Sequence, residues 1–181
     1  MAYKKTVPRD FFSDLENSKE DDPYLTSAYK QHFKFKTIRP ATLEEQKHDK
    51  VDYIMVMPDG TTEAIEQKRR LKAYPDILLE MASILELLTF GWLFATKADH
   101  LAYYVEPIDT LILIRLNDLK KAWFEKGPAW LDRFPLKLAR TRDDLHGNVR
   151  YHTLNIPIPI NELKEAGCDV LEIKGIKDVK T

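Results

Sequence analysis

The chain has 181 residues, of which 44% are hydrophobic and 31% are charged, and its formal net charge at pH 7 is -1. This length supports one well-formed core and the proportions are those of an ordinary globular protein, so we expect a single domain spanning 1–181. A near-neutral chain is not expected to coat nucleic acid through bulk charge, so any contact with DNA must be local.

Cysteine content and hydropathy bear on the compartment. A lone cysteine, Cys168, excludes an intramolecular disulfide framework and a multi-cysteine zinc site, and it suits a reducing compartment. Residues 1–12 contain no apolar signal-peptide core, and the longest apolar stretch, 84–95, contains Glu86 and is too short to cross a bilayer. We therefore expect a cytoplasmic protein without a membrane segment, with any disorder at the ends, for instance over 1–9.

The first part of the chain is typical of helices followed by a strand. Residues 10–19 are helix-like, and a second helix is predicted to begin at Asp22, the N-cap before a proline, and to end near Phe33. The run 33–38 alternates apolar and basic residues, as a half-exposed strand does. A polar loop is expected from there through Asp49.

Two strand-like runs then form a predicted hairpin. The runs 51–57 and 61–68 are separated only by the turn residues Pro58-Asp59-Gly60. Antiparallel pairing about the middle of that turn makes the numbers of facing residues sum to 118, which places Asp52 across from Glu66 on one face of the sheet. Facing Cβ atoms lie about 4.5 to 5.5 Å apart, so the two carboxylates repel unless a cation or a shared proton lies between them.

The hairpin carries one further charged group on this face. Because strand side chains alternate, Lys68 shares the face of Glu66, and its ammonium can reach the same gap. An acid followed two residues later by lysine occurs six times in the chain, so the tripeptide Glu66-Gln67-Lys68 is a weak signal without the facing Asp52. The alternative interpretation is a solvated hairpin whose charges keep a sheet edge soluble.

The middle of the chain contains several apolar runs. Residues 76–88 are apolar on nearly every face, and we expect a strand over 76–82. The runs 100–106 and 110–116 are typical of central strands. Asn117 is predicted to cap a helix that ends at a Gly-Pro pair.

The last part is expected to elaborate a core that is already formed, over 117–181. A hairpin is predicted through His146-Gly147-Asn148, followed by an edge strand or an extended segment in the proline-rich run 155–160. Asn161 is predicted to cap a short final helix before a closing strand near 169–175.

Two groups of basic residues are candidate DNA contacts. One group follows the second strand of the first hairpin at once, and the other flanks the turn of the later hairpin. The candidates are Arg69, Arg70, Lys72, Arg140, Arg142 and Arg150. A solvated surface is the alternative for both groups.

The acid at Asp52, followed on the next strand by Glu66-Gln67-Lys68, resembles the PD-(D/E)XK nuclease superfamily. The resemblance implies an α/β fold with a mixed central sheet flanked by helices, a restriction-endonuclease-like core in the order helix, three strands, helix, strand. Over 50–120 the chain is similar to small phage and prophage-borne nucleases, in which a tripeptide like Lys97-Ala98-Asp99 leads into an aromatic strand. Two features depart from the pattern: a valine precedes Asp52, and no clear helix follows Lys68 at once.

The resemblance assigns roles to residues of the hairpin. It implies that Asp52 and Glu66 ligate Mg²⁺ (or Mn²⁺) with the backbone carbonyl of Gln67, since this ion prefers oxygen ligands and keeps several waters. Lys68 would orient or help deprotonate the attacking water and stabilise negative charge. Glu80 would be an additional acid; the alternative is a glutamate hydrogen-bonded at a sheet edge.

Three functions follow from these assignments. The leading one is a metal-dependent DNA endonuclease in phage DNA processing, recombination or repair, acting in the host cytoplasm if phage-encoded. A Holliday junction resolvase is the nearest alternative, and a symmetric homodimer would favour it because two sites must cut two strands. The alternative from another class is a catalytically inactive nuclease fold that binds DNA or serves assembly.

Overall fold

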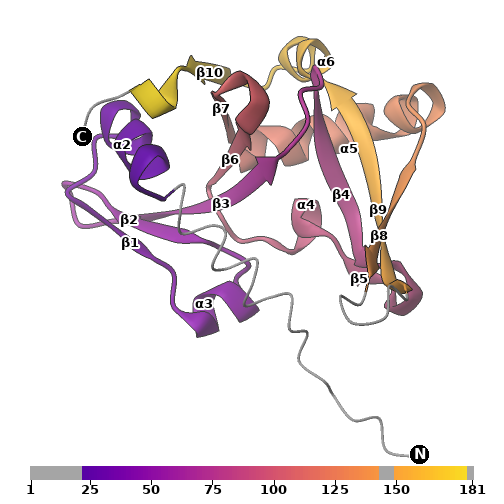
Figure 1. Ribbon diagram of the computed structural model, residues 1–181, viewed down its shortest axis with the longest axis horizontal. Coiled ribbons are helices and arrows are strands. Elements are labelled where there is room, and N and C mark those ends of the chain that lie inside the picture. Colours follow the sequence, from indigo (N-terminus) through magenta and orange to yellow (C-terminus); the bar gives the residue numbers. More distant parts are fainter. Residues whose placement is uncertain (1–21, 143–148, 179–181) are drawn as a thin grey trace, which may run out of the picture.

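The strands lie in two sheets, a six-stranded one and a four-stranded one (Figure 1). The computed structural model describes residues 22–142 and 149–178. The larger sheet has the order β1-β2-β3-β6-β7-β10 and is mixed, because β3 and β6 are parallel while the other neighbours are antiparallel. Its strands are β1 (Thr37–Pro40), β2 (Tyr53–Val56), β3 (Thr62–Arg70), β6 (His100–Val105), β7 (Thr110–Arg115) and β10 (Val170–Lys174).

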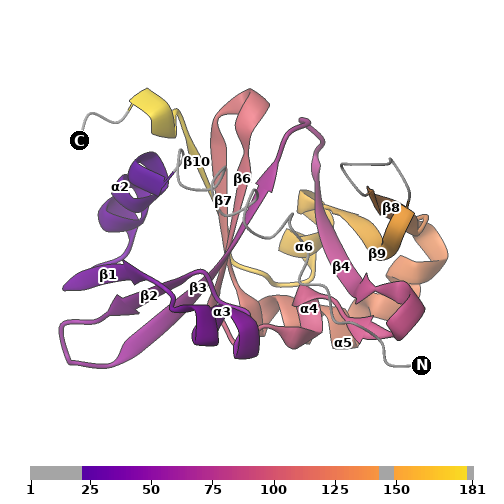
Figure 2. The ribbon, with the colours of Figure 1, turned by 60° about the horizontal axis from the view of Figure 1, so that its bottom comes forward.

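The smaller sheet is antiparallel throughout and has the order β5-β4-β9-β8. Its strands are β4 (Asp76–Ile84), β5 (Thr89–Phe90), β8 (Lys137–Arg142) and β9 (Val149–Pro159). β3 and β4 are joined by the connection 71–75 and diverge from it into the two sheets (Figure 2). The chain thus folds as a single α/β domain with a mixed central sheet and flanking helices, as expected.

Helices flank the sheets and close two cores. They are α2 (Asp22–His32), α3 (Leu43–His48), α4 (Trp92–Ala95), α5 (Leu116–Arg133) and α6 (Ile160–Glu165), with short 3-10 turns at Leu85–Leu87, Glu106–Ile108 and Ile176–Asp178. Leu25 and Tyr29 of α2 pack on one face of the central sheet, against Met55 and Ile65 among others. The opposite face shares a second core with the smaller sheet and α5. No helix in the described ranges is long and apolar enough to cross a bilayer.

Alternation along the first hairpin decides which residues enter which core. Tyr53 and Ile65 are buried on the α2 face, whereas Ile54 and Ala64 are partly buried against the core shared with the smaller sheet. Even-numbered positions of β2 and β3 therefore face the smaller sheet. The predicted hairpin is confirmed on this point.

The helix predicted to end at Gly127-Pro128 continues to Arg133, so that prediction was wrong. Its last turns bury Trp130 beside Trp123, with ring centroids 6.3 Å apart. Arg133 also forms an ion pair with Glu162 on α6, at 2.6 Å. An interior proline costs about 3 kcal/mol, and burial of a tryptophan offsets a cost of that size.

The proline-rich run ends β9, which lies between β4 and β8 in the smaller sheet. Beyond Asn155 the run pairs with β4 alone, so this part of the strand is at an edge, as predicted. The pairing with β8 reaches only as far as Asn155, so Pro157 and Pro159 lie past the end of that strand. A missing N–H is tolerated there, because no ladder bond to β8 is required. Ile156 and Ile158, between the prolines, are fully buried.

The loop predicted before the hairpin contains α3. Thr42 and Glu45 form a reciprocal capping box, in which Thr42 N donates to Glu45 Oε2 at 2.7 Å and Glu45 N donates to Thr42 Oγ1 at 3.3 Å. The spacing Thr-x-x-Glu predicts the start of a helix, but the polar composition of the segment favoured a loop.

Other boundaries moved by a few residues. The strand predicted over 33–38 lies at 37–40, α5 begins at Leu116 instead of after Asn117, and Asn161 lies inside α6. The predicted helix over 10–19, the segment 1–9 and the turn 146–148 lie outside the described residues.

Candidate functional site

The paired register of the hairpin ends at Tyr53, and Asp52 lies in the bend directly before β2. Tyr53 faces Ile65 and Ile54 faces Ala64, which is the register whose numbers sum to 118. Asp52 N donates to Ile65 O at 2.8 Å, and Asp52 Oδ2 accepts a hydrogen bond from Gln67 N at 2.7 Å. The Asp52 carboxylate is therefore held against the backbone of β3, next to the residue that carries the second acid.

Two rows of side chains face each other where β3 and β4 diverge. By alternation, Glu66, Lys68 and Arg70 share one face of β3, while Asp76 and Glu80 share one face of β4. Near the connection 71–75 the rows are tied by an ion pair between Arg70 and Asp76 at 2.5 Å, whose side chains are only 11% and 15% exposed. Farther from that connection, acids from both strands come together.

Lys68 and Glu66 form the closest contact in this group. Lys68 Nζ lies 2.5 Å from Glu66 Oε1; the glutamate side chain is 6% exposed and the lysine side chain 35%. The ammonium thus lies on the buried carboxylate, in the gap where the sequence predicts a cation. Its partial exposure leaves it a route to solvent.

The titration of these groups is coupled. Burial raises the pKa of Glu66, the charge of Lys68 opposes this, and the charges of Asp52 and Glu80 raise the pKa further, to about 7. For Lys68, burial lowers the pKa, but the charges of Glu66, Asp52 and Glu80 outweigh it, so its pKa is raised above the ordinary value. Glu66 and Lys68 therefore lie in one electrostatic unit with Asp52 and Glu80, whose charges act on both of them.

Glu80 reaches this unit from the smaller sheet. The strand over 76–82 is confirmed, but it does not lie beside the hairpin in one sheet, as the sequence suggested. Glu80 Oε1 accepts hydrogen bonds from Ser83 Oγ at 2.5 Å and from Trp92 N at 3.3 Å. A Cβ at Gly91 would lie 2.2 Å from the carbonyl oxygen of Glu80, so this close approach of two backbones requires glycine.

Gln67 contributes its backbone to the site and its side chain to the opposite face. Tyr29 Oη, on α2, donates to Gln67 Oε1 at 2.8 Å, and Tyr29 is fully buried. The Gln67 N–H points at Asp52, and the N–H and C=O of a strand residue point to the same side, so the carbonyl also lies on the Asp52 side. Sequence reasoning missed Tyr29, because no local spacing links α2 with β3.

The candidate DNA contacts fall into different surroundings. Arg69 pairs with Glu106 at 2.8 Å and Arg70 with Asp76. Lys72 is exposed in the connection 71–75. Arg140 on β8 and Arg150 on β9 are exposed, and Arg142 ends β8, with a side chain outside the described part. The structure therefore ties Arg69 and Arg70 into the fold and leaves Lys72, Arg140 and Arg150 at the surface.

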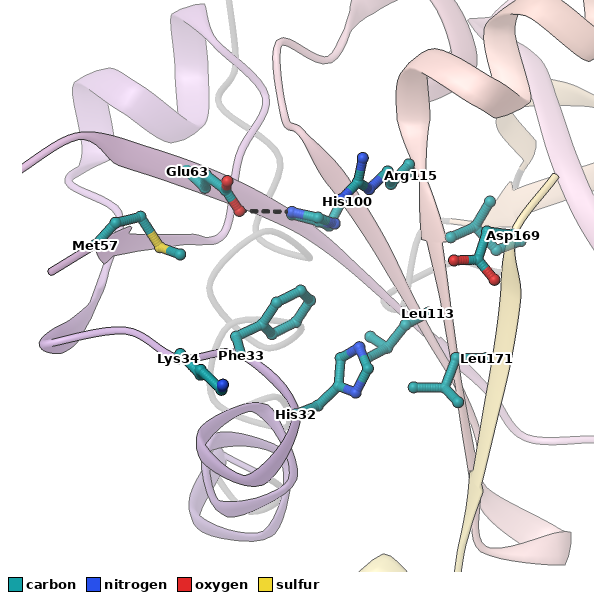
Figure 3. A pocket seen from close by; sticks show the side chains of 11 residues that line it. His32, Phe33, Lys34, Met57, Glu63, His100, Leu113, Arg115, Asp169 and Leu171 are labelled. Atoms are coloured by element: carbon teal, nitrogen blue, oxygen red, sulfur yellow. Dashed lines mark hydrogen bonds and ion pairs between the residues drawn. The ribbon is translucent and has the colours of Figure 1, made fainter. Parts of the chain in front are cut away.

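A pocket of about 280 Å³ lies on the other face of the central sheet (Figure 3). Glu63 and His100 form an ion pair at its wall, at 2.8 Å, and Phe33 lies over His100 with ring centroids 4.7 Å apart. Glu63 thus faces away from Glu66, as its position in the alternation predicts. This pocket is separate from the group of acids.

The donor set suits a hard divalent cation. Two carboxylates and a backbone carbonyl are oxygen ligands of the kind that Mg²⁺ takes, and the mutual repulsion of Asp52, Glu66 and Glu80 favours a positive charge among them. In the ranges 22–142 and 149–178, no three or more His, Cys, Asp or Glu side chains are arranged so that they could hold a metal ion. Lys68 would have to turn away from Glu66 before a metal could replace its ammonium.

Comparison of the chain with protein-family models, with curated proteins and with solved structures finds no match.

Proposed function

We propose that the protein is a divalent-metal-dependent nuclease that hydrolyses phosphodiester bonds in DNA. The observation that carries this proposal is the electrostatic coupling of Asp52, Glu66 and Glu80 with Lys68 where the two sheets diverge. A buried glutamate whose pKa is raised by neighbouring carboxylates, beside a partly exposed amine, is a pattern that favours a functional site, because such a contact costs stability.

The order of elements gives separate support. With α3 set aside as an insertion between β1 and β2, the path α2, β1, β2, β3, α4, β6 has the helix, three strands, helix, strand order that the resemblance to PD-(D/E)XK nucleases implies. β4 and β5 are inserted before α4, and this insertion accounts for the missing helix directly after Lys68. The insertion also supplies Glu80.

Asp52 and Glu66 would hold Mg²⁺ or Mn²⁺ together with the Gln67 carbonyl. A bound ion of this kind lowers the pKa of a coordinated water and offsets charge on the phosphate. Asp52 is positioned for this by the Gln67 N–H, and Glu66 by its place on β3. Glu80, fixed by Ser83 and the Trp92 N–H, adds negative charge at the same point.

Lys68 would act as a charged group. Because its pKa is raised, it keeps its proton at neutral pH and is a poor general base as long as Glu66 is ionised beside it. A lysine that releases Glu66 to a metal would be left with an ammonium that can donate to a phosphate oxygen or orient water. Charge stabilisation of the transition state is the role that this electrostatic setting favours.

Cleavage of supercoiled, branched and single-stranded DNA tests the proposal. We expect the wild type to cut at least one of these substrates with Mg²⁺ or Mn²⁺ and none with EDTA. Asp52→Asn, Glu66→Gln and Lys68→Met should each lower the rate by roughly 100-fold or more, as loss of a main electrostatic group does. Glu63→Gln, on the same strand but on the opposite face, is the matched control and should keep the rate within about twofold.

Two results would overturn the nuclease proposal. Cleavage that persists in all three variants would place the chemistry elsewhere. DNA binding without cleavage by the wild type would favour an inactive nuclease fold that acts as a binding or assembly module, and the ion pair between Lys68 and Glu66 gives that function a structural basis, since it satisfies the buried acid without a metal.

A further inference from the structure

An exposed aromatic ring with cations around it lies at the connection between the two strands that carry the acids. Tyr74 is 45% exposed, and its ring centroid lies 4.7 Å from the guanidinium carbon of Arg70 and 5.7 Å from Lys137 Nζ. Lys72, two residues earlier, is also exposed. We refer to Tyr74, Lys72 and Lys137 as the Tyr74 patch.

The sheet register places this patch next to the acids. Glu80 on β4 faces Asn155 on β9, and Asn155 faces Lys137 on β8, so the three residues form one row across the smaller sheet. Residues paired in this way point to the same face, and neighbouring strands lie about 4.8 Å apart, so the backbone of Lys137 is roughly 10 Å from that of Glu80. Asn155 in between is buried, so the row sets the spacing between the acids and the patch and is not itself a DNA contact.

The ring of Tyr74 is restrained by the Arg70 side chain that it contacts. The Arg70 side chain is 11% exposed and is fixed by its ion pair with Asp76 and by a hydrogen bond to Tyr103 Oη at 3.1 Å. A guanidinium that is anchored on both sides restricts the ring that it contacts, which lowers the entropy cost of using that ring for binding. The Lys137 side chain is exposed and long, so its ammonium can leave the Tyr74 ring and bind a phosphate instead.

We propose that the Tyr74 patch binds single-stranded DNA, with an unpaired base stacked on Tyr74 and the backbone phosphates at Lys137 and Lys72. A strand held at the patch would then lie close enough to the acids for a neighbouring phosphate to reach them. A base offers its face to a side chain only when it is unstacked from its neighbours, and a ring flanked by cations provides both stacking and phosphate contacts. The proposal rests on the nuclease function and defines its substrate as DNA with a single-stranded portion next to the cut.

Fluorescence anisotropy with a labelled 20-nucleotide single strand and the matching duplex tests this, in EDTA so that no metal-dependent cleavage occurs. Tyr74→Ala should weaken single-strand binding by roughly tenfold, while Tyr74→Phe, which keeps the stacking ring, should stay within about twofold of wild type. Lys137→Gln should weaken binding and reduce the slope of log affinity against log salt by about one. Tyr24→Ala and Lys121→Gln, exposed on α2 and α5, are the matched controls and should bind as wild type.

Three outcomes would overturn the proposal. They are wild-type affinity in Tyr74→Ala, an equal loss for single strand and duplex, and a loss in Tyr74→Phe as large as in Tyr74→Ala. Thermal melts of each variant distinguish lost binding from lost folding. Binding that depends on Tyr74 in a wild-type protein that cleaves no DNA with Mg²⁺ or Mn²⁺ would refute the nuclease function and leave the patch standing.

Discussion

Glu66 on β3 and Glu80 on β4 belong to different sheets, yet the charge of Glu80 helps to raise the pKa of Glu66. Burial is the main reason that the pKa of Glu66 is raised to about 7, and the charges of Asp52 and Glu80 add to it. The strands β3 and β4 leave one short connection and enter different sheets. The charge of Glu80 is thereby added to the charges of Asp52 and Glu66, which the hairpin alone supplies. The following predictions depend on that combined charge.

Replacement of Glu66 by Gln should remove a pH-dependent loss of stability. A carboxyl whose pKa is raised on folding, from 4.5 to about 7, keeps its proton longer in the folded state, so its contribution to the free energy of unfolding falls as pH rises between these values. Relative to wild type, Glu66→Gln should therefore gain up to about 3 kcal/mol between pH 4.5 and pH 8, at about 1.4 kcal/mol per pKa unit. Urea unfolding at a series of pH values in EDTA measures this, with Glu63→Gln as control. A difference between Glu66→Gln and wild type that does not change with pH would show that Glu66 titrates normally.

Lys68→Met should destabilise the metal-free protein more at high pH than at low pH. At pH 8 the buried Glu66 carboxylate loses its partner, at a cost of about 1–3 kcal/mol once the partial exposure of Lys68 is taken into account. At pH 5 the carboxyl is protonated and the cost should be below about 1 kcal/mol. Lys164→Met, which breaks an exposed pair with Glu172, should cost less than about 1 kcal/mol at both pH values. Equal losses for Lys68→Met at pH 5 and pH 8 would contradict the coupling.

Tyr29→Phe should weaken metal binding without unfolding the protein. The Tyr29 hydroxyl donates to the side chain of Gln67, and the Gln67 N–H donates to Asp52. Without the hydroxyl, Gln67 and therefore the Asp52 ligand are held less firmly. Loss of such an outer partner lowers metal affinity by about 10-fold to 100-fold. Tyr104→Phe is the matched control: it removes a hydroxyl that donates to Asp109 in the same core, so it should cost similar stability and leave metal affinity unchanged. If the two variants bind Mn²⁺ equally well, Tyr29 has only a structural role.

Gly91→Ala should displace Glu80. The new methyl would lie 2.2 Å from the Glu80 carbonyl oxygen, which is a backbone atom and cannot swing aside, so the strand must shift. We expect a loss of about 2 kcal/mol or more, in the range of overpacked sites, together with weaker metal binding. Gly60→Asn, at a turn where a Cβ would meet no atom within 4 Å and where asparagine tolerates the positive φ, should lose much less. A stable Gly91→Ala variant with unchanged metal affinity would indicate that Glu80 is not part of the site.

The local part of the site could be predicted from the sequence, because it depends on alternation and on one turn. The register about Asp59 brought Asp52, Glu66 and Lys68 together, and alternation turned Glu63 away. Glu80 was identified as a candidate, but its partner sheet was not, because the pairing of β4 with β9 joins residues about 80 positions apart and leaves no local pattern.

The parts that could not be predicted are those where packing overrides local preference. Pro128 remains inside α5 because Trp130 is buried beyond it. The contacts of Tyr29 with Gln67 and of Tyr74 with Lys137 join distant segments, so no spacing in the sequence indicates them.

Binding of Mn²⁺, measured by isothermal titration calorimetry at pH 7, tests most directly whether these groups form a metal site. We expect the wild type and Glu63→Gln to bind with equal affinity and to release protons on binding, because Glu66 must lose its proton to ligate the ion. Asp52→Asn and Glu66→Gln should each bind at least tenfold more weakly. Wild-type protein that binds no Mn²⁺, or variants that bind it as tightly as wild type, would contradict a metal site at Asp52 and Glu66.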